Sequence, residues 1–398
     1  MKTVINHESD CRLFGLALIL LLASMVFCSF GCGDLEEQHE DVPDIQVDDD
    51  DDDDDTGDGW DYPYYLVIGG GLSETLSLLT INGPDSFSLA NDVQVTSSSI
   101  NQTVVYEKEL YAVCSLSHSV MVYDVHDLSI SRQVSVGIGN NPMMLAFHED
   151  KKAFIANFLS NDVTYYDLAD DDGDALYTIA MPSGDELPTD GDGETWARPG
   201  GLIMAAGKAY AALSNLDGAY VAGGPGLVAV IDPESKSVDS IIEMEGRDTV
   251  GVYARDDDLV YVISAGDYEV GEGFVGNGKV ELIDTQTDEI VGSVETGGAP
   301  FEMVINSDNV AYLGNGAEGV VLSFDAETHE MLDPIDIRDP DDTLGLSYAS
   351  ALVVDGNGYL YAAEFNHDRL FVIDTMNQNK IVATFTVNDG PDTLSFIR

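Results

Sequence analysis

Short apolar stretches recur along the chain from about residue 64 to its end, and most of them finish in an aspartate. Each is too short for a helix and is rich in the residue types that favour β-strands. Six copies end in Asp, at residues 120–124, 163–167, 228–232, 280–284, 321–325 and 370–374, and 76–80 is a degenerate first copy. Neighbouring copies lie about 41 to 65 residues apart. The pattern indicates one unit written seven times, with insertions in some copies.

Two further strand-like stretches precede these motifs. One is represented by residues 153–157, 209–212, 259–263 and 359–363, and a more N-terminal one by residues 143–147 and 351–354. Repeats of this length, with several short strands and hardly any helical pattern, are typical of β-propellers. We therefore expect an all-β fold, a seven-bladed β-propeller of four-stranded antiparallel blades.

The two ends of the repeat region predict how the ring closes. The chain finishes at residues 392–397 with an innermost strand that nothing follows, and the region begins at residues 64–68 with a second strand that nothing precedes. Pairing of these two strands would complete one blade from both termini. It would also remove exposed strand edges, which otherwise invite aggregation.

Several segments carry a family resemblance. Residues 361–366, which read Tyr-Ala-Ala-Glu-Phe-Asn and run on to the motif ending at Asp374, are one such copy, and residues 155–157 with Asp167 are a second. Over residues 61–398 the chain resembles the YVTN-repeat (YncE-like) β-propellers, a family of secreted and periplasmic proteins. The resemblance implies the fold. It carries no catalytic residues over to this chain, because the repeat motifs serve strand and hairpin geometry and the fold hosts binders and enzymes alike.

The first 31 residues predict a lipoprotein-type signal peptide. An uncharged apolar run at residues 13–27 follows a polar leader and is too short to span a bilayer comfortably. Small residues at Ser29 and Gly31 then precede Cys32, which resembles the lipobox of bacterial lipoproteins. Ser29 and Phe30 depart from the usual residues of that motif. We predict lipidation of Cys32, with an ordinary secretory signal or an uncleaved anchor as the alternatives.

Residues 32–60 predict an acidic disordered tether. Eight consecutive aspartates, Asp48 to Asp55, repel one another, and the segment has almost nothing apolar to bury. Gly33 stands where lipoproteins retained in the inner membrane tend to carry Asp. The resemblance therefore implies an outer-membrane lipoprotein that faces the periplasm or the cell surface, attached to the membrane through its lipid.

Charge and cysteine content narrow the classes of function. The 398 residues contain 73 acidic and 16 basic side chains, for a net charge of −57. Such a chain lacks the positive surface that nucleic acids and anionic lipids require, so we expect no nucleic-acid partner. Four cysteines do not make a disulfide scaffold, and Cys114 lies in an apolar stretch where a buried thiol is expected. We expect a monomer.

Four long insertions supply the strongest functional signal. Strand counting places residues 182–197, 215–226, 266–278 and 333–347 on one face, and long loops on a rigid scaffold are where binding usually resides. We predict a non-catalytic binding module for an envelope or extracellular protein, peptide or glycan; drift of surface loops is the alternative. The candidate ligand-binding residues are Asn141, Trp196, Arg198, Tyr220, Tyr268, Phe274, Glu364 and Asn366. Arg198 could pair with a ligand carboxylate or neutralise neighbouring acids.

Two acidic segments are candidate metal sites. Carboxylates alternate along each, at Asp170, Asp172 and Asp174, and at Asp190, Asp192 and Glu194. Alternating carboxylates can meet a Ca²⁺ ion, although each segment lacks the complete loop and its downstream bidentate Glu. No other cofactor is indicated.

Signals for catalysis are weak. The chain has no haem-attachment motif, nucleophile elbow or dinucleotide fingerprint that follows a strand. His118 and His367 share the loop-rich face, so a lactonase-type propeller hydrolase that acts in the central channel is the alternative function. A convergent His–acid pair in the central depression would favour an enzyme, and an aromatic surface would favour binding.

Overall fold

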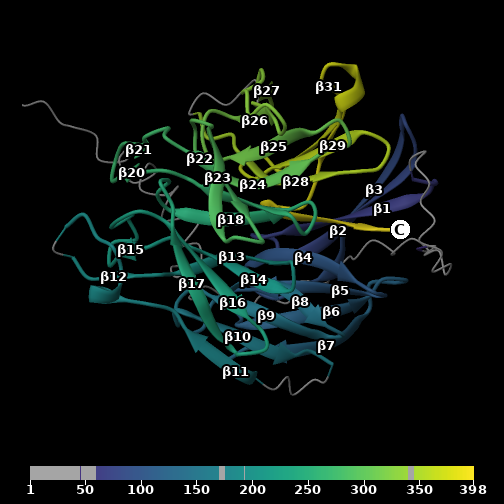
Figure 1. The fold of residues 1–398 in the computed structure, drawn as a ribbon. Coiled ribbons are helices and arrows are strands. Elements are labelled where there is room, and N and C mark those ends of the chain that lie inside the picture. The colour runs from purple at the N-terminus through teal and green to yellow at the C-terminus, as the bar shows by residue number, and fades with distance from the viewer. Residues whose placement is uncertain (1–44, 46–59, 170–174, 192, 339–344) are drawn as a thin grey trace, which may run out of the picture.

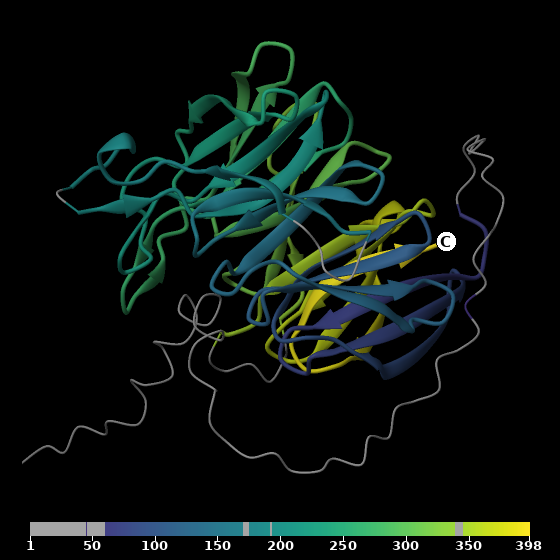
Figure 2. The same cartoon turned by 90° about the horizontal axis from the view of Figure 1, so that it is seen from below.

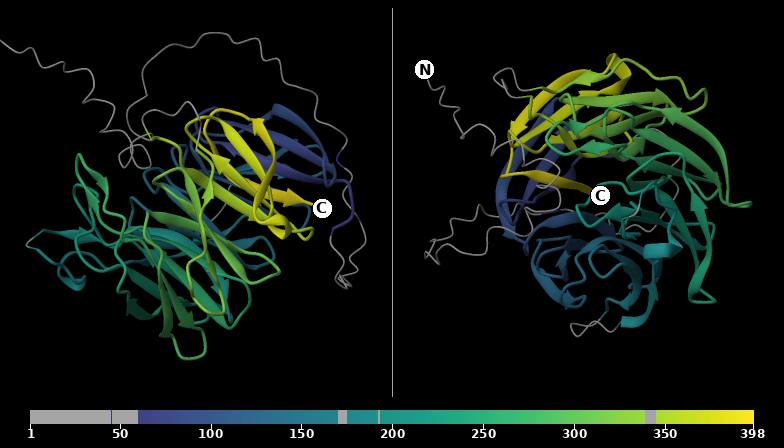
Figure 3. Two further views of the ribbon diagram at one scale, coloured as in Figure 1. Left: turned by 90° about the horizontal axis from the view of Figure 1, so that it is seen from above. Right: turned by 90° about the vertical axis from the view of Figure 1, so that its left-hand side faces the viewer.

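The computed structural model describes residues 45, 60–169, 175–191, 193–338 and 345–398. These residues form a ring of seven four-stranded antiparallel sheets, the blades, which follow one another in chain order around a central axis (Figures 1 and 3). The prediction of an all-β, seven-bladed propeller is confirmed. No helix among the described residues is long and apolar enough to cross a membrane.

Each blade runs from an innermost strand beside the axis to an outermost strand at the rim, and its strands are named in that order. The first three blades are β32 (Pro391–Ile397), β1 (Tyr64–Gly70), β2 (Thr75–Gly83), β3 (Ser86–Val95); β4 (Ile100–Tyr106), β5 (Glu109–Cys114), β6 (Ser119–Asp124), β7 (Ile130–Ser135); and β8 (Pro142–Glu149), β9 (Lys152–Asn157), β10 (Asp162–Asp167), β11 (Ala175–Ala180).

The fourth and fifth blades are β13 (Pro199–Ala205), β14 (Lys208–Leu213), β16 (Leu227–Asp232), β17 (Ser237–Glu243); and β18 (Thr249–Ala254), β19 (Leu259–Ser264), β22 (Lys279–Asp284), β23 (Glu289–Glu295). The last two are β24 (Pro300–Ile305), β25 (Val310–Asn315), β26 (Val320–Asp325), β27 (Ile335–Asp336); and β28 (Ala349–Val354), β29 (Tyr359–Glu364), β30 (Arg369–Asp374), β31 (Lys380–Thr386). Two short 3₁₀ helices, η1 (Gly184–Glu186) and η2 (Thr375–Asn377), also occur among the described residues.

Burial along the strands explains their composition. The second strands, such as β9 and β19, are buried at every position after the first, because neighbouring blades cover both faces of the sheet. They therefore read as continuous apolar runs. The outermost strands alternate, as β17 does, because one of their faces meets water. Cys114 ends β5 fully buried, and burial raises the pKa of its thiol to about 12, so it is the buried apolar thiol that the sequence predicted.

The repeated aspartate has a structural role in the turn that follows the third strand. In β16 and β22, a carboxylate oxygen of Asp232 and Asp284 accepts a hydrogen bond from the backbone N–H two residues later, at 2.9 Å in both cases. Asp124, Asp325 and Asp374 make the same contact. This contact is an Asx-turn, in which the Asp side chain takes the place of a backbone acceptor. The motif therefore specifies the tight hairpin that leads to the outermost strand.

The ring closes as predicted. Strand β1 pairs with β2 on one side and with the C-terminal strand β32 on the other, from Tyr65↔Ile397 to Gly69↔Thr393 and, beyond a β-bulge, at Gly70↔Pro391. The purple N-terminal strands accordingly lie beside the yellow C-terminal ones in Figure 2. The hydroxyl of Tyr64 also donates to the buried carboxyl of Asp355 in the last blade, at 2.6 Å. Closure thus joins the first described strands to the last through both backbone and side chains.

The insertions at residues 182–197, 215–226 and 266–278, as far as they are described, lie on the face that bears the loops between second and third strands. Of the fourth insertion, at 333–347, residues 339–344 lie outside the described residues. The insertions before β13 and after β14 pair with each other through β12 (Thr195–Trp196) and β15 (Leu216–Asp217). The insertion after β19 folds into its own hairpin, β20 (Tyr268–Glu269) with β21 (Gly273–Phe274). These loops have structure of their own, which fixes the side chains they carry.

Candidate functional site

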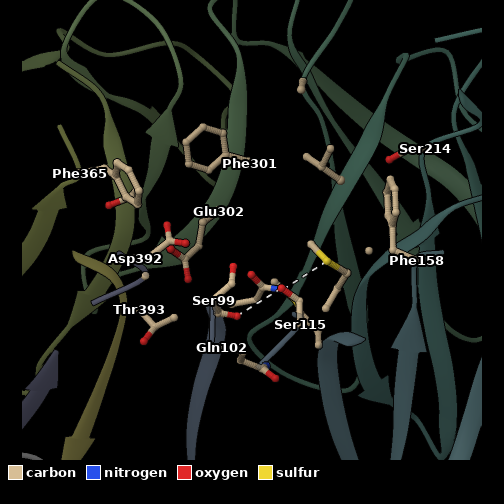
Figure 4. Close-up of a pocket in the computed structure, with 18 of the residues that line it drawn as sticks. Ser99, Gln102, Ser115, Phe158, Ser214, Phe301, Glu302, Phe365, Asp392 and Thr393 are labelled. Carbon is tan, nitrogen blue, oxygen red and sulfur yellow. Dashed lines mark hydrogen bonds between the residues drawn. The ribbon is translucent and has the colours of Figure 1, made fainter. Parts of the chain in front are cut away.

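A cavity of about 360 Å³ opens on the loop-rich face at the centre of the ring (Figure 4). Its size is at the lower end of the range for small-ligand pockets. Each innermost strand contributes to it through the same local feature, a β-bulge after the first residue of the strand. A bulge inserts one extra residue and redirects its side chain. All seven residues at these bulges line the cavity: Asn101, Met143, Gly200, Val250, Phe301, Ser350 and Asp392.

Three acidic side chains face into this cavity. Burial raises the pKa of Glu302 to about 8, that of Asp392 to about 7 and that of Asp248 to about 6. The carboxyls of Glu302 and Asp392 lie near each other on one wall (Figure 4), and the Asp392 charge raises the pKa of Glu302 further. No Lys, Arg or His occurs among the described residues that line the cavity. The site therefore has uncompensated negative charge whenever these acids ionise.

Hydrogen bonds satisfy this acidic wall only in part. The Oε2 atom of Glu302 accepts from the backbone N–H of Leu352 in the next blade, at 3.0 Å. Oxygen Oε1 of Glu302 and both carboxyl oxygens of Asp392 accept no hydrogen bond from the described part of the chain. A carboxylate has about four acceptor positions, so this wall can accept several more hydrogen bonds.

Aromatic rings form a second part of the lining, beside neutral polar, glycine and aliphatic residues. Near the acids, Tyr348 packs edge-on against Phe301, with ring centroids 6.2 Å apart, and stacks on Phe365 at 5.5 Å. The lining also includes the rings of Phe158, Tyr220, Tyr268 and Phe274. Tyr268 and Phe274 pack edge-to-face across the β20–β21 hairpin, at 5.3 Å. The cavity thus combines apolar aromatic walls with a small set of acidic groups, the usual make-up of a specific ligand site.

The predicted ligand-binding residues divide into two sets. Asn141, Tyr220, Tyr268 and Phe274 all line the cavity, so the structure brings together half of the predicted set. Trp196, Arg198, Glu364 and Asn366 are not among its lining residues. The aromatic residues Tyr220, Tyr268 and Phe274 come from the insertions that contain β15 and the β20–β21 hairpin, and they meet at the same cavity.

Arg198 is enclosed by carbonyl groups and aromatic rings instead of carboxylates. Its Nη1 donates to the carbonyl oxygens of Phe158 and Leu159, both at 3.2 Å. Its guanidinium carbon lies 5.2 Å from the ring centroid of Trp196 and 5.4 Å from those of Phe158 and Tyr220. Burial lowers its pKa. These contacts are with carbonyl oxygens and with the Phe158 and Tyr220 rings, and no ion pair of Arg198 with an acid occurs among the described residues. Pairing of Arg198 with a ligand carboxylate stays a prediction.

Glu364 holds a loop in place. Its fully buried carboxylate accepts from the backbone N–H of His367, at 3.0 Å, and of Tyr348, at 3.3 Å, and it contacts the His367 ring at 3.1 Å. Asn366 is exposed and donates to the carbonyl of Leu346. The residues that give this segment its family resemblance therefore position Tyr348 and Phe365, which do line the cavity.

The calcium candidates are only partly within the described residues. Asp170, Asp172, Asp174 and Asp192 lie outside them. Asp190 forms an ion pair with Arg247, which also binds Asp267, and Glu194 is exposed. The described residues contain no group of three or more His, Cys, Asp or Glu side chains arranged to hold a metal ion.

Sequence reasoning missed Glu302, Asp392 and Asp248. The sequence does contain a signal for Glu302 and Asp392. Each is an acidic residue near the start of an innermost strand, just after Pro300 or Pro391, and the corresponding residues of the other innermost strands are uncharged. The bulge itself could not be predicted, because one extra residue in a strand does not change the pattern of polar and apolar residues.

Comparisons with known proteins support the fold. No protein-family model matches the chain, and no curated protein matches its sequence. Among solved structures, it is similar to a putative 6-phosphogluconolactonase of Bacteroides fragilis, with a TM-score of 0.61 and 14% identity over 85% of this chain and 99% of that one.

Two further structures are similar over most of their length. Hydrazine synthase of Kuenenia stuttgartiensis has a TM-score of 0.58 and 16% identity, covering 74% of this chain and 88% of that one. The Dos1 propeller has a TM-score of 0.55 and 10% identity, covering 84% and 87%. At these identities the likeness shows the β-propeller fold and leaves function to be argued from the site.

Proposed function

We propose that the protein is a non-catalytic binding module whose central cavity and surrounding loops hold a protein, peptide or glycan ligand from the cell envelope or the extracellular space. The observation that carries this proposal is the convergence of insertion residues on the cavity. Tyr220, Tyr268 and Phe274 come from two separate insertions and meet around one opening. Rigid aromatic surface of this kind provides contact area at low cost in conformational entropy.

The contacts of the histidines favour binding over hydrolysis. His118 accepts from the backbone N–H of Asn141, and His367 pairs with the buried Glu364; neither is among the described residues that line the cavity. A hydrolase that uses the channel remains the second candidate function, supported by the raised pKa values of Glu302 and Asp392, since acids that titrate near neutral pH suit general acid–base catalysis.

A ligand panel tests this proposal. The full chain, purified in detergent micelles, is screened against glycan and peptide arrays beside Tyr268→Ala/Phe274→Ala. Because this variant removes two rings from the wall, we expect its affinity for the ligand found to fall at least tenfold. The control is Ile138→Ala, which alters a 95% exposed side chain on a loop of the same face outside the cavity lining. Equal binding by the double variant would remove the loops from the site, and turnover of a lactone panel would overturn the non-catalytic assignment.

We further propose that the chain is an outer-membrane lipoprotein anchored through Cys32, and that it acts as a monomer. The position of the N-terminal connection supports display of the cavity away from the membrane. Trp60 begins the continuous described segment, and its backbone N–H donates to Asn357 at 2.9 Å. Asn357 lies in the turn from β28 to β29, at the opposite end of the innermost strands from the cavity mouth.

Metabolic labelling with a fatty-acid probe tests the anchor. We expect Cys32→Ala to lose the label and to leave the membrane fraction, because no second cysteine follows in the predicted tether. Cys28→Ala is the matched control and should keep both properties. A labelled, membrane-bound Cys32→Ala protein would show that the anchor is different.

A further inference from the structure

The acidic wall of the cavity differs in chemistry from the rest of the binding face. Glu302 and Asp392 come from different innermost strands, β24 and β32, and present three oxygens that accept no hydrogen bond from the described residues. Both side chains are half-buried, and withdrawing a carboxylate from water without supplying a hydrogen-bond donor costs free energy. A bound ligand that donates hydrogen bonds and carries positive charge would remove this cost.

The residues around Glu302 and Asp392 indicate what kind of hydrogen-bond donor the ligand carries. The rings of Phe301, Tyr348 and Phe365 lie on the same side of the cavity as the acid pair (Figure 4). Aromatic faces attract cations and also cover apolar stems. Anionic ligands are disfavoured, since no basic side chain occurs among the described lining residues.

Classes of cation differ in the number of hydrogen bonds that they can donate to the free carboxyl oxygens. A quaternary ammonium has no N–H to donate and would leave the carboxyl oxygens unsatisfied. A bare divalent ion prefers six or more oxygen ligands, and the described residues contain no cluster of three acidic or metal-binding side chains at this wall. A primary or secondary ammonium donates two or three hydrogen bonds from one positive nitrogen, which matches the free acceptors.

Resting on the proposed function, we propose that the group held in the cavity is a protonated primary or secondary amine on an apolar stem, bound between the Glu302 and Asp392 carboxyls and the rings of Phe301, Tyr348 and Phe365. The source of the group is a free amine or the lysine side chain of a peptide. Both have the same ammonium chemistry, and the stem packs against the rings.

Binding of such a group is linked to pH. Glu302 and Asp392 must ionise to pair with the ammonium, and burial holds the pKa of both near neutrality. Two other titratable groups line the same cavity. The pKa of Tyr348 is raised well above its usual range by burial and by Asp392, so it stays neutral, and burial raises the pKa of Asp248 to about 6. Affinity for the amine should therefore rise as pH increases from 6 to 8.5.

The test measures binding by calorimetry with the full chain in detergent micelles. The probes are phenethylamine, its neutral isostere 2-phenylethanol and the anion 3-phenylpropionate. Two blocked glycine-flanked pentapeptides, one with a central lysine and one with acetyl-lysine, distinguish the sources. We expect phenethylamine to bind at least tenfold more tightly than 2-phenylethanol or 3-phenylpropionate, and more tightly at pH 8.5 than at pH 6. Lysine-peptide binding that acetylation abolishes assigns the source to a side chain; phenethylamine binding alone assigns it to a free amine.

Variants connect the binding to the two carboxyls. Glu302→Gln keeps an acceptor for the Leu352 N–H, and Asp392→Asn is isosteric, so both should fold while amine affinity falls at least tenfold. Asp308→Asn is the control, since it removes an exposed acid from the same blade outside the cavity lining. Equal binding of 2-phenylethanol, no effect of the two variants, binding of Ca²⁺ in place of the amine, or no amine binding at all would each overturn the inference. A ligand that binds on the arrays and is lost in Tyr268→Ala/Phe274→Ala would leave the proposed function intact in every one of these cases.

Discussion

Individual acids in this protein have opposite roles according to where the fold places them. Asp232 and Asp284 lie at exposed hairpins, where their carboxylates accept backbone hydrogen bonds and stabilise the turn. Glu302 and Asp392 lie in the cavity, where burial favours the protonated form. Carboxyl groups thus stabilise turns at one end of the blade and line the cavity at the other.

This difference predicts how stability depends on pH. The pKa of Glu302 is about 8, that of Asp392 about 7 and that of Asp248 about 6 in the folded chain. In the unfolded chain these groups titrate near pH 4. These three groups therefore bind more protons in the folded state between about pH 4 and 8, and their contribution to stability falls as pH rises through this window.

Urea unfolding at pH 5.5 and 8.5 measures the effect. We expect Glu302→Gln/Asp392→Asn to reduce the loss of unfolding free energy over this range by an amount on the order of 2 kcal/mol, because neutral amides do not titrate. Asp308→Asn should leave the loss unchanged. Parallel pH profiles for the wild type and the double variant would contradict the prediction.

At the scale of elements, the innermost strands matter most, since they bring seven blades close to one axis. Gly251 on β18 shows how tight this approach is. A Cβ atom added there would lie 2.5 Å from the carbonyl oxygen of Phe301 on β24 and 3.1 Å from Cδ1 of Ile263. The backbone of one blade thus occupies the space that a side chain of its neighbour would need.

Gly251→Ala should therefore push β18 away from β24 and destabilise the protein by about 1–3 kcal/mol. Gly191→Ala is the matched control, because nothing lies within 4 Å of the added atom and its backbone has no positive φ. Urea unfolding midpoints give the comparison. Equal midpoints for the two variants would show that the innermost strands separate without cost.

The predictability of each element follows from its physics. Third strands such as β16 and second strands such as β14 could be predicted from the sequence, because strands buried on both faces consist of a continuous run of apolar residues between turn residues. The bulges of the innermost strands were not found, because they change the direction of one side chain without changing polarity. Tyr268 and Phe274 were recognised from their insertion, whereas Phe301 and Tyr348 depend on tertiary arrangement and could not be separated from core residues.

At the scale of the whole molecule, the first and last described strands share one blade. The β1 strand lies between β2 and β32, and Arg398 at the C-terminus packs over the Trp60 ring at 4.7 Å. The order of strands could be predicted, since the missing innermost strand at one end matched the extra strand at the other. The cavity could not, because its lining comes from all seven blades at once.

This closure has a mechanical consequence. A pull on the N-terminal end would act along β1, which is held by antiparallel registers on both of its long sides. The hydrogen bonds of both registers then share the load in shear, whereas a strand peeled from one edge would lose its bonds one after another. The strand that closes the ring is therefore held against a pull along its own axis by two rows of hydrogen bonds, one to each end of the chain's fold.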